Sequence, residues 1–175
     1  EKNNSQGLID MGICMAKGVG DLPIGDKGLV ARMKKAWKVK DLPEKVHKDI
    51  YDYLEEGCLK NIFIFGEDPL GCSDHKVHEA GWLSVADFVV VQDYFMTETA
   101  RHADLVLPAS FPVESGGSFS NTQKMIQPFG AQFIPTVELT GVQQLAALSK
   151  KLGVACKSDP DEVMAEAVTL LAPAV

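Results

Sequence analysis

The sequence predicts a three-layer α/β fold, with a mostly parallel sheet and helices on both faces in a Rossmann-like arrangement. Three short apolar runs carry this prediction, at residues 61–65, 88–91 and 104–107. Each run is continuous rather than alternating and rich in β-branched or aromatic residues, which is typical of a strand buried on both faces. Polar or turn-forming residues end each run, and helical segments separate the runs. Such a β-α-β-α-β unit favours a ligand crevice at the carboxyl ends of parallel strands.

Composition and charge exclude several classes of protein. The chain has 175 residues, of which 46% are hydrophobic and 23% charged, as is typical of a folded globular domain. Its net charge of −7, without a balancing basic stripe, argues against a nucleic-acid surface. No apolar run approaches the roughly 20 residues of a membrane helix, and the polar start is not a signal peptide. We therefore expect a cytoplasmic protein without direct membrane insertion.

The cysteines and the first residue add two expectations. Cys14, Cys58, Cys72 and Cys156 are scattered and form no C-x-x-C motif, so reduced thiols are the simplest interpretation. A zinc or iron–sulfur site built from this chain alone is not expected. The sequence begins with Glu1 instead of methionine, which suggests a fragment of a longer polypeptide.

We expect a single α/β domain over residues 1–175. It would comprise an irregular leading segment (1–28), an α/β core (29–155) and a C-terminal helix (156–175). The leading segment holds six glycines and shows little periodicity, which predicts loop.

Apolar periodicity and capping residues predict the other elements in order. Helices are expected at 29–38 and 44–56, the second with Asp41 as its cap and Gly57 as its stop. A helix capped by Ser73 or Asp74 runs to about Leu83, and a short one with Thr97 as its cap reaches His102. Residues 109–136 are expected to be irregular. Two helices close the chain, at 142–152 and at 160–171, the latter capped by Ser158 or Asp159.

Polar residues follow two neighbouring strands where each strand ends. Gly66, Glu67 and Asp68 come after the first strand, and Gln92 and Asp93 come after the second. Because parallel strands end at the same edge of a sheet, these residues are expected to lie side by side. Gly66 would permit close backbone approach, the next helix would offer N–H groups to a phosphate, and an acid could accept from a ribose hydroxyl or a guanine edge. The same pattern is also typical of plain turn residues.

Several longer motifs occur in a definite order along the chain. They are N-S-Q-G (4–7), D-M-G (10–12), G-E-D-P (66–69), V-Q-D-Y-F-M-T-E-T-A (91–100) and A-D-L-V-L-P-A (103–109). A last, spaced motif consists of Glu114, Gly117, Ser118, Phe119, Ser120, Asn121 and Gln127. Over about residues 4–155 this set resembles the molybdopterin oxidoreductase family. The nearest likeness is to formate dehydrogenase catalytic subunits and to the large iron–sulfur subunit of NADH–quinone oxidoreductase.

The resemblance implies that this chain helps to hold a molybdopterin guanine dinucleotide, the organic ligand of molybdenum or tungsten. In the family, the G-E-N/D-P loop and the V-Q-D turn face the nucleotide half of that cofactor. This nominates as cofactor-binding residues Gly66, Glu67, Asp68, Gln92 and Asp93. Thr97, which could reach a phosphate, and Ser115, where many relatives carry lysine, complete the nominated set.

The resemblance also implies what other regions supply. In the family the metal ligand and a cysteine-bound iron–sulfur cluster lie upstream, so we assign no catalytic residue and no metal ligand to this chain. The expected partners are the remaining domains of the same polypeptide and other respiratory or dehydrogenase subunits. Many relatives carry two arginines where this chain has Lys124-Met125, and an aspartate where it has Val142. The alternative is therefore a cofactor-less structural domain of an NADH–quinone oxidoreductase large subunit.

Overall fold

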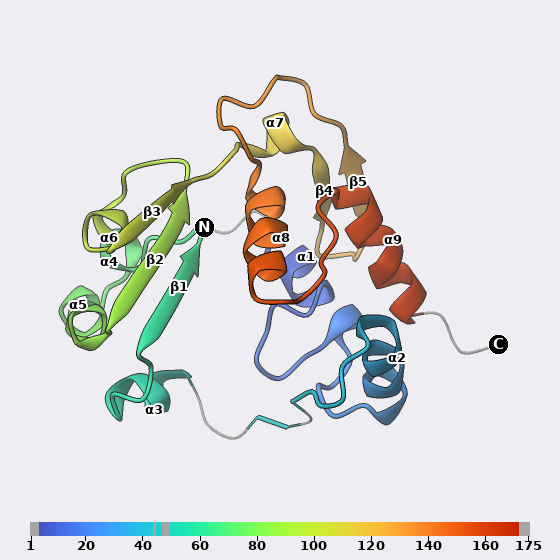
Figure 1. Cartoon of the computed structure of the whole chain (residues 1–175), viewed down its shortest axis with the longest axis horizontal. Coiled ribbons are helices and arrows are strands. Elements are labelled where there is room, and N and C mark those ends of the chain that lie inside the picture. The colour runs from blue at the N-terminus through green and yellow to red at the C-terminus, as the bar shows by residue number, and fades with distance from the viewer. Residues whose placement is uncertain (1–3, 44, 47–49, 172–175) are drawn as a thin grey trace. The chain divides into compact units, whose positions relative to one another are not determined.

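A computed structural model describes the chain except for residues 1–3, 44, 47–49 and 172–175 (Figure 1). The chain forms two compact units, each of which is described by itself. The sheet unit comprises Lys48–Ser115 and Phe133–Gln144. The hairpin unit comprises Glu1–His47, Gly116–Gln132 and Leu145–Val175.

Three parallel strands in the order β1-β2-β3 form the sheet of the sheet unit (Figure 1). They are β1 (Asn61–Phe65), β2 (Phe88–Asp93) and β3 (Leu105–Pro108). Helices α4 (Pro69–Cys72) and α5 (Lys76–Val85) follow β1, and α6 (Glu98–Arg101) follows β2. In the pairing register Phe65 lies opposite Gln92, and Asp93 lies opposite Pro108. The predicted α/β class with a mostly parallel sheet is confirmed.

The central strand β2 carries the core of the sheet unit. Val89 and Val91 lie on one face of the strand and pack with Ala100 of α6. Partly buried apolar residues of the neighbouring elements surround this cluster: Ile62, Ile64, Leu83, Ala86, Ala103 and Val106. Full burial of an aliphatic side chain contributes about 1.5–3 kcal/mol. On the opposite face, the Gln92 side chain meets Gln144 in the first turns of α8 (Gly141–Lys151).

Only β2 is buried on both faces, which corrects the prediction for the other two strands. In β1, Phe63 and Phe65 are 47% and 43% exposed, and their rings stack on one another with centroids 6.3 Å apart. In β3, Leu105 is 43% exposed. The reason is that β1 and β3 lie at the two edges of the described sheet, where fewer neighbours cover a side chain.

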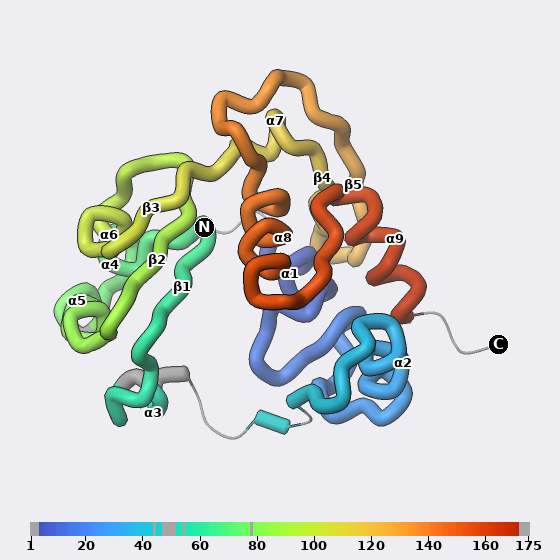
Figure 2. The backbone as a smooth tube through the Cα atoms, in the orientation of Figure 1, coloured from blue at the N-terminus to red at the C-terminus, as the bar shows by residue number. Residues whose placement is uncertain are grey.

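The hairpin unit gathers three separate stretches of chain, as the blue, brown and red segments of the tube in Figure 2 show. Its elements are α1 (Ser5–Asp10), the 3₁₀ turn η1 (Val19–Asp21), α2 (Lys27–Trp37), the antiparallel pair β4 (Gly117–Ser120) and β5 (Ile126–Phe129), most of α8, and α9 (Pro160–Leu171). The core joins Leu29 and Met33 of α2 to Ala167 and Leu170 of α9, together with Val19. The Arg32 guanidinium also donates to the Leu170 carbonyl.

Asn4 joins the start of the chain to strand β4. Its amide donates to the Ser118 carbonyl (3.3 Å) and accepts from the Ser120 N–H (3.0 Å). Gly7 packs directly beneath this amide, since a Cβ at Gly7 would lie 2.3 Å from Asn4 Oδ1. Two of the sequence motifs, N-S-Q-G and the G-S-F-S stretch of the spaced motif, therefore meet in this unit.

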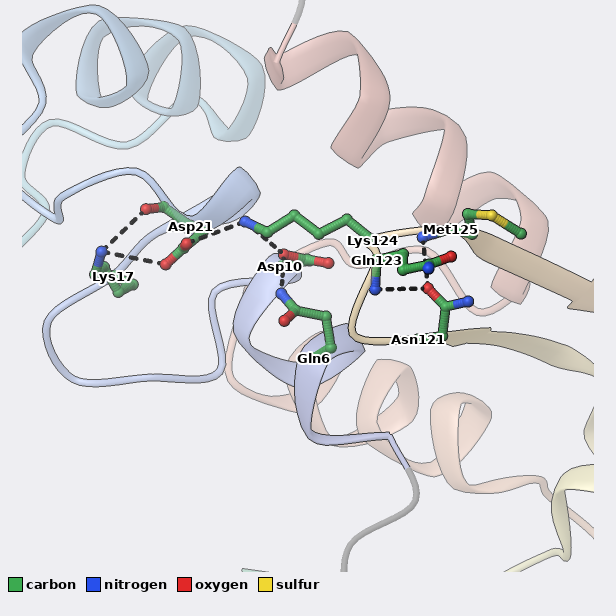
Figure 3. A network of polar contacts seen from close by, with 8 residues as sticks. All are labelled: Gln6, Asp10, Lys17, Asp21, Asn121, Gln123, Lys124 and Met125. Carbon is green, nitrogen blue, oxygen red and sulfur yellow. Dashed lines mark hydrogen bonds and ion pairs between the residues drawn. The ribbon is translucent and has the colours of Figure 1, made fainter.

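A charged network fastens the β4–β5 turn to the first segment of the chain (Figure 3). Lys124 Nζ lies 3.1 Å from Asp21 and 3.9 Å from Asp10, and Lys17 contacts Asp21 at 3.2 Å. The hydrogen bond from Lys124, followed by that from Lys17, lowers the pKa of Asp21. Within the turn, Asn121 Oδ1 accepts from the N–H groups of Gln123 (2.9 Å) and Met125 (3.0 Å). The charge of Lys124 is thus compensated inside the hairpin unit.

Several other sequence predictions are confirmed. The helix predicted at 29–38 is α2, although it begins two residues earlier, at Lys27, where Asp26 caps it (2.7 Å to the Leu29 N–H). Helix α8 lies within one residue of its predicted bounds. Thr97 caps α6 by accepting from the Ala100 N–H at 3.1 Å. Asp159 caps α9 through the N–H groups of Asp161 (3.0 Å) and Glu162 (3.1 Å).

Four further predictions are wrong. Helix α5 begins at Lys76 with His75 in the cap position, so neither Ser73 nor Asp74 caps it. The leading segment is not loop throughout, because Ser5–Asp10 forms α1 around the Asn4 contact. The helix predicted at 44–56 is α3 (Ile50–Glu55), stopped by Gly57 at φ +63°, while Asp41, Lys45 and Val46 are not helical. Residues 44 and 47–49 lie outside the described part. The segment 109–136 contains the short helix α7 (Pro112–Ser115) and the β4–β5 pair.

The other expectations concern the chain as a whole. That all residues belong to one domain stays a prediction. None of the helices in the described part of the chain is long and apolar enough to cross a membrane. All four cysteines are free and exposed.

Gly7→Ala is expected to lower the free energy of unfolding by about 1–3 kcal/mol, because the added methyl group overpacks the contact with Asn4. Gly81→Ala is the matched control, since nothing lies within 4 Å of a Cβ at this exposed position of α5. It should stabilise the chain by about 0.5–1 kcal/mol through helix propensity. Urea denaturation measures both, and a Gly7→Ala variant as stable as the wild type would contradict the role of this contact.

Candidate functional site

The carboxyl ends of the three strands bring the nominated segments together. The Gly66 N–H donates to the Gln92 carbonyl at 2.8 Å, and the Ala109 N–H donates to the Asp93 carbonyl at 3.0 Å. The loop after β1, the end of β2 and the segment after β3 therefore lie side by side at one edge of the sheet. This confirms the neighbourhood expected for Gly66 and Gln92.

Gly66 turns the chain out of β1. Its φ of +61° is a conformation that favours glycine, and nothing lies within 4 Å of the position that a Cβ would occupy. The backbone here borders open space, so another molecule can approach it closely. Glu67 follows and is half-buried.

The Asp68 carboxylate accepts hydrogen bonds from groups within the sheet unit. Its Oδ1 accepts from the Thr99 hydroxyl (2.6 Å), the Thr99 N–H (2.9 Å) and the Gly71 N–H (3.1 Å). Burial alone would raise the pKa of Asp68, but the hydrogen bonds from Thr99, Gly71 and the Glu98 N–H outweigh it and lower the pKa below 3.8. The carboxylate thus caps α4 and fastens the loop after β1 to α6.

The helix after β1 does not offer the N–H groups that the sequence suggested for a phosphate. Its first residue, Pro69, has no N–H. The Leu70 N–H donates to the Thr99 hydroxyl at 3.0 Å, and the Gly71 N–H donates to Asp68. The donors of this first turn are already paired within the protein.

The Gln92 side chain also forms a hydrogen bond within the sheet unit. It is 7% exposed, and its Nε2 donates to Gln144 Oε1 at 2.8 Å. The Gln144 amide in turn donates to the carbonyls of Pro108 (2.7 Å) and Leu139 (2.9 Å). This chain of amides holds the start of α8 against the end of β3.

Asp93 differs from Asp68 in having capacity left for a ligand. It is 8% exposed, and within the described part of the chain its carboxylate accepts a single hydrogen bond, from the Phe95 N–H to Oδ1 at 3.1 Å. A carboxylate can accept about four hydrogen bonds. Asp93 is therefore the nominated acid best suited to accept from another molecule.

Glu114 fixes the backbone that leads to Ser115. Its two oxygens accept from the N–H groups of Phe111 (2.8 Å) and Thr136 (3.1 Å). The Phe111 hydrogen bond, against the opposing effect of burial and with further help from Thr136, lowers the pKa of Glu114 below 4.5. Ser115, which ends α7, donates its hydroxyl to the Phe111 carbonyl at 3.3 Å. Both residues therefore hold the segment that carries Phe111.

An aromatic cluster next to Asp93 was missed in the sequence analysis. Tyr94 and Phe111 stack with ring centroids 4.7 Å apart, and Phe95 meets Phe111 edge-on at 5.7 Å. Tyr94, Phe95 and Phe111 are 43%, 64% and 39% exposed. Two aromatic residues directly after the polar end of a strand were the available signal, but Phe111 joins them only through the fold.

The site therefore combines a buried carboxylate, an open glycine turn and exposed aromatic rings at one sheet edge. Such an arrangement suits a planar ring that donates hydrogen bonds along one side. In the described part of the chain, no group of three or more His, Cys, Asp or Glu side chains could hold a metal ion.

Comparisons with known proteins agree on one family. The family profile described as Molybdopterin oxidoreductase matches residues 15–150. A Staphylococcus aureus (strain bovine RF122 / ET3-1) protein, provisionally named a formate dehydrogenase, is 35% identical over 175 residues, covering 96% of this chain and 18% of the relative. A Bacillus subtilis (strain 168) protein with the same provisional designation is 35% identical over 137 residues, covering 77% of this chain and 14% of the relative. The chain thus spans less than a fifth of the length of these relatives.

Glu114→Gln is expected to change how stability depends on pH. A group whose pKa is lower in the folded chain contributes stability above its unfolded pKa, and that contribution is lost as the pH falls through the folded pKa. The wild type should be more stable than the variant near neutral pH, and the difference should shrink as the pH falls below about 4.5. Chemical denaturation over a pH series measures this difference, and a difference independent of pH would count against it.

Proposed function

The chain belongs to the molybdopterin oxidoreductase family, and from that premise we propose that its sheet unit holds the nucleotide half of a molybdopterin guanine dinucleotide. The whole protein would be a formate dehydrogenase-like enzyme, as the names of its relatives suggest. Bound in the complete enzyme, the pterin half would carry the molybdenum or tungsten at which the substrate is oxidised. Metal ligands, an iron–sulfur cluster and the rest of the cofactor site would come from other regions of a cytoplasmic polypeptide and its partner subunits.

The observation that carries this proposal is the buried carboxylate of Asp93 at the carboxyl edge of the sheet. Guanine presents N1–H and its N2 amino group along one edge, and a carboxylate can accept from both. The backbone at Phe95 already orients Asp93 Oδ1. A base without these donors would leave Asp93 unmatched on binding, at a cost of about 1–3 kcal/mol, so this residue provides specificity.

The aromatic cluster supplies the second part of the proposed site. Stacking of a base on an aromatic side chain contributes about 1–3 kcal/mol. Tyr94, Phe95 and Phe111 lie directly after β2 and β3, so a guanine ring bound to Asp93 would find an aromatic face beside it. The aromatic side chain that stacks on guanine and the carboxylate that accepts its hydrogen bonds would then lie at adjacent positions of one sheet edge.

The remaining nominated residues divide into two groups. We propose that Gly66 allows the ligand to approach the backbone, that Glu67 accepts from a ribose hydroxyl, and that the Thr97 hydroxyl donates to a phosphate. Asp68 and Gln92 would act through the loops that they hold, because their hydrogen bonds lie within the protein. Ser115 would act in the same way, through the Phe111 carbonyl.

A second candidate function is a structural domain without cofactor, as in an NADH–quinone oxidoreductase large subunit. The observation in its favour is that Lys124, at the position of an arginine in many relatives, is compensated by Asp21 and Asp10. Its charge therefore has a role in the fold without any ligand. Nucleotide binding separates the two candidates.

The first test is calorimetric titration of the 175-residue chain with GDP. We expect saturable binding that Asp93→Asn weakens about tenfold or more, because the amide replaces an acceptor by a donor facing guanine. Asp87→Asn is the matched control, since Asp87 is exposed at the amino end of the same strand and its loss changes the net charge equally. No binding to folded wild type at millimolar GDP would favour the structural candidate.

Phe111→Leu tests the stacking face. It is expected to weaken GDP binding about tenfold, through the loss of about 1–3 kcal/mol of stacking, and to leave the weak binding of ribose 5-phosphate unchanged. Phe88→Leu, a half-exposed ring at the amino end of β2, should affect neither ligand. Competition against a fluorescent guanine nucleotide measures both affinities, and equal losses for the two ligands would argue against stacking.

A further inference from the structure

Thr99 is a polar residue without any solvent exposure, at the junction of two loops. It belongs to α6, which follows β2, and its exposed fraction is 0%. Its hydroxyl donates to Asp68 Oδ1 at 2.6 Å and accepts from the Leu70 N–H at 3.0 Å. Its N–H donates to the same Asp68 oxygen at 2.9 Å. Because the hydroxyl is used as both donor and acceptor, its orientation is determined.

These bonds form a fixed point on the loop after β1. A second fixed point is the Gly66 N–H, which donates to the Gln92 carbonyl at 2.8 Å. Gly66 is thus fastened to β2, and Asp68 is fastened to α6, both of which belong to the part of the chain that carries Asp93. Glu67 lies between these two positions in the sequence.

We propose that Thr99 and Asp68 are positioning residues, which hold the Gly66–Glu67 turn at a set position relative to Asp93. Their hydrogen bonds would order the turn before a ligand arrives, so that binding does not have to pay for that ordering. The consequence for ligand affinity rests on the proposed function, whereas the ordering of the turn does not.

Two substitutions of Thr99 separate the role of its hydroxyl group from that of its methyl group. Thr99→Val keeps the volume and the branched shape but removes the hydroxyl, which leaves Asp68 with one donor fewer and the Leu70 N–H without its acceptor. Thr99→Ser keeps the hydroxyl and removes a methyl group. Thr169→Val is the matched control, because Thr169 is an exposed threonine of α9 whose hydroxyl donates to the Ala165 carbonyl.

The test combines amide hydrogen exchange of the 175-residue chain with titration by GDP. In Thr99→Val, exchange at Gly66, Leu70 and Gly71 should accelerate at least tenfold, with that of Val90 and Val91 unchanged. The pKa of Asp68, followed by NMR, should rise because a donor to its carboxylate is lost. GDP binding should weaken about tenfold, and Thr99→Ser should stay within about twofold of wild type in each measurement.

Each result decides a separate point. Unchanged exchange at Gly66, Leu70 and Gly71 in Thr99→Val would overturn the positioning role. Faster exchange with unaltered GDP affinity would overturn its link to binding. A wild type that binds no GDP would defeat the proposed function alone, since the exchange data still test the turn. If Thr99→Val does not fold, Asp68→Asn, which weakens the bonds to Thr99 and Gly71 without emptying the buried position, is held to the same expectations for exchange at Gly66 and Gly71 and for GDP affinity.

Discussion

The parallel pairing of β2 with both of its neighbours is the constraint on which the sheet unit depends. Since β2 is covered on both faces, its side chains must find suitable neighbours on each face of the strand. Val89 and Val91 pack toward the helices, while the Gln92 amide needs a polar partner and finds it in Gln144. The same register places the residues after all three strands at one edge. Every candidate ligand contact in the unit takes its position from this strand.

Three acidic residues near that edge have different roles. Asp68 and Glu114 each accept hydrogen bonds from backbone N–H groups that would otherwise lack partners, and these bonds lower the pKa of both. Asp93 orients a single N–H of the next turn. Under the proposed function, the residues that shape a binding loop and the residue that would face its ligand therefore belong to different motifs near the same sheet edge. Only their hydrogen bonds tell them apart.

The sequence predicted those parts of the fold that local patterns determine. Apolar runs located all three parallel strands, although pairing extends β2 by two polar residues, Gln92 and Asp93. Capping chemistry located α6 and α9 through Thr97 and Asp159. The β4–β5 pair was missed because its strands are short, Pro128 interrupts one of them, and Asn4 supports the other from 116 positions away in the sequence. The aromatic cluster and the Asp68–Thr99 contact were missed for the same reason, since each joins segments that only the sheet brings together.

The layout of the hairpin unit has a consequence for the order in which the chain acquires structure. The sheet unit is built mainly from neighbouring segments, whereas the core of the hairpin unit joins α2 to α9, and the Arg32 contact with Leu170 spans 138 positions. Closing so long a loop costs more entropy and is slow compared with local pairing. During synthesis the sheet unit can therefore gain order while α2 still lacks its partner helix, α9. Helix α9 completes a core that α2 and Val19 began.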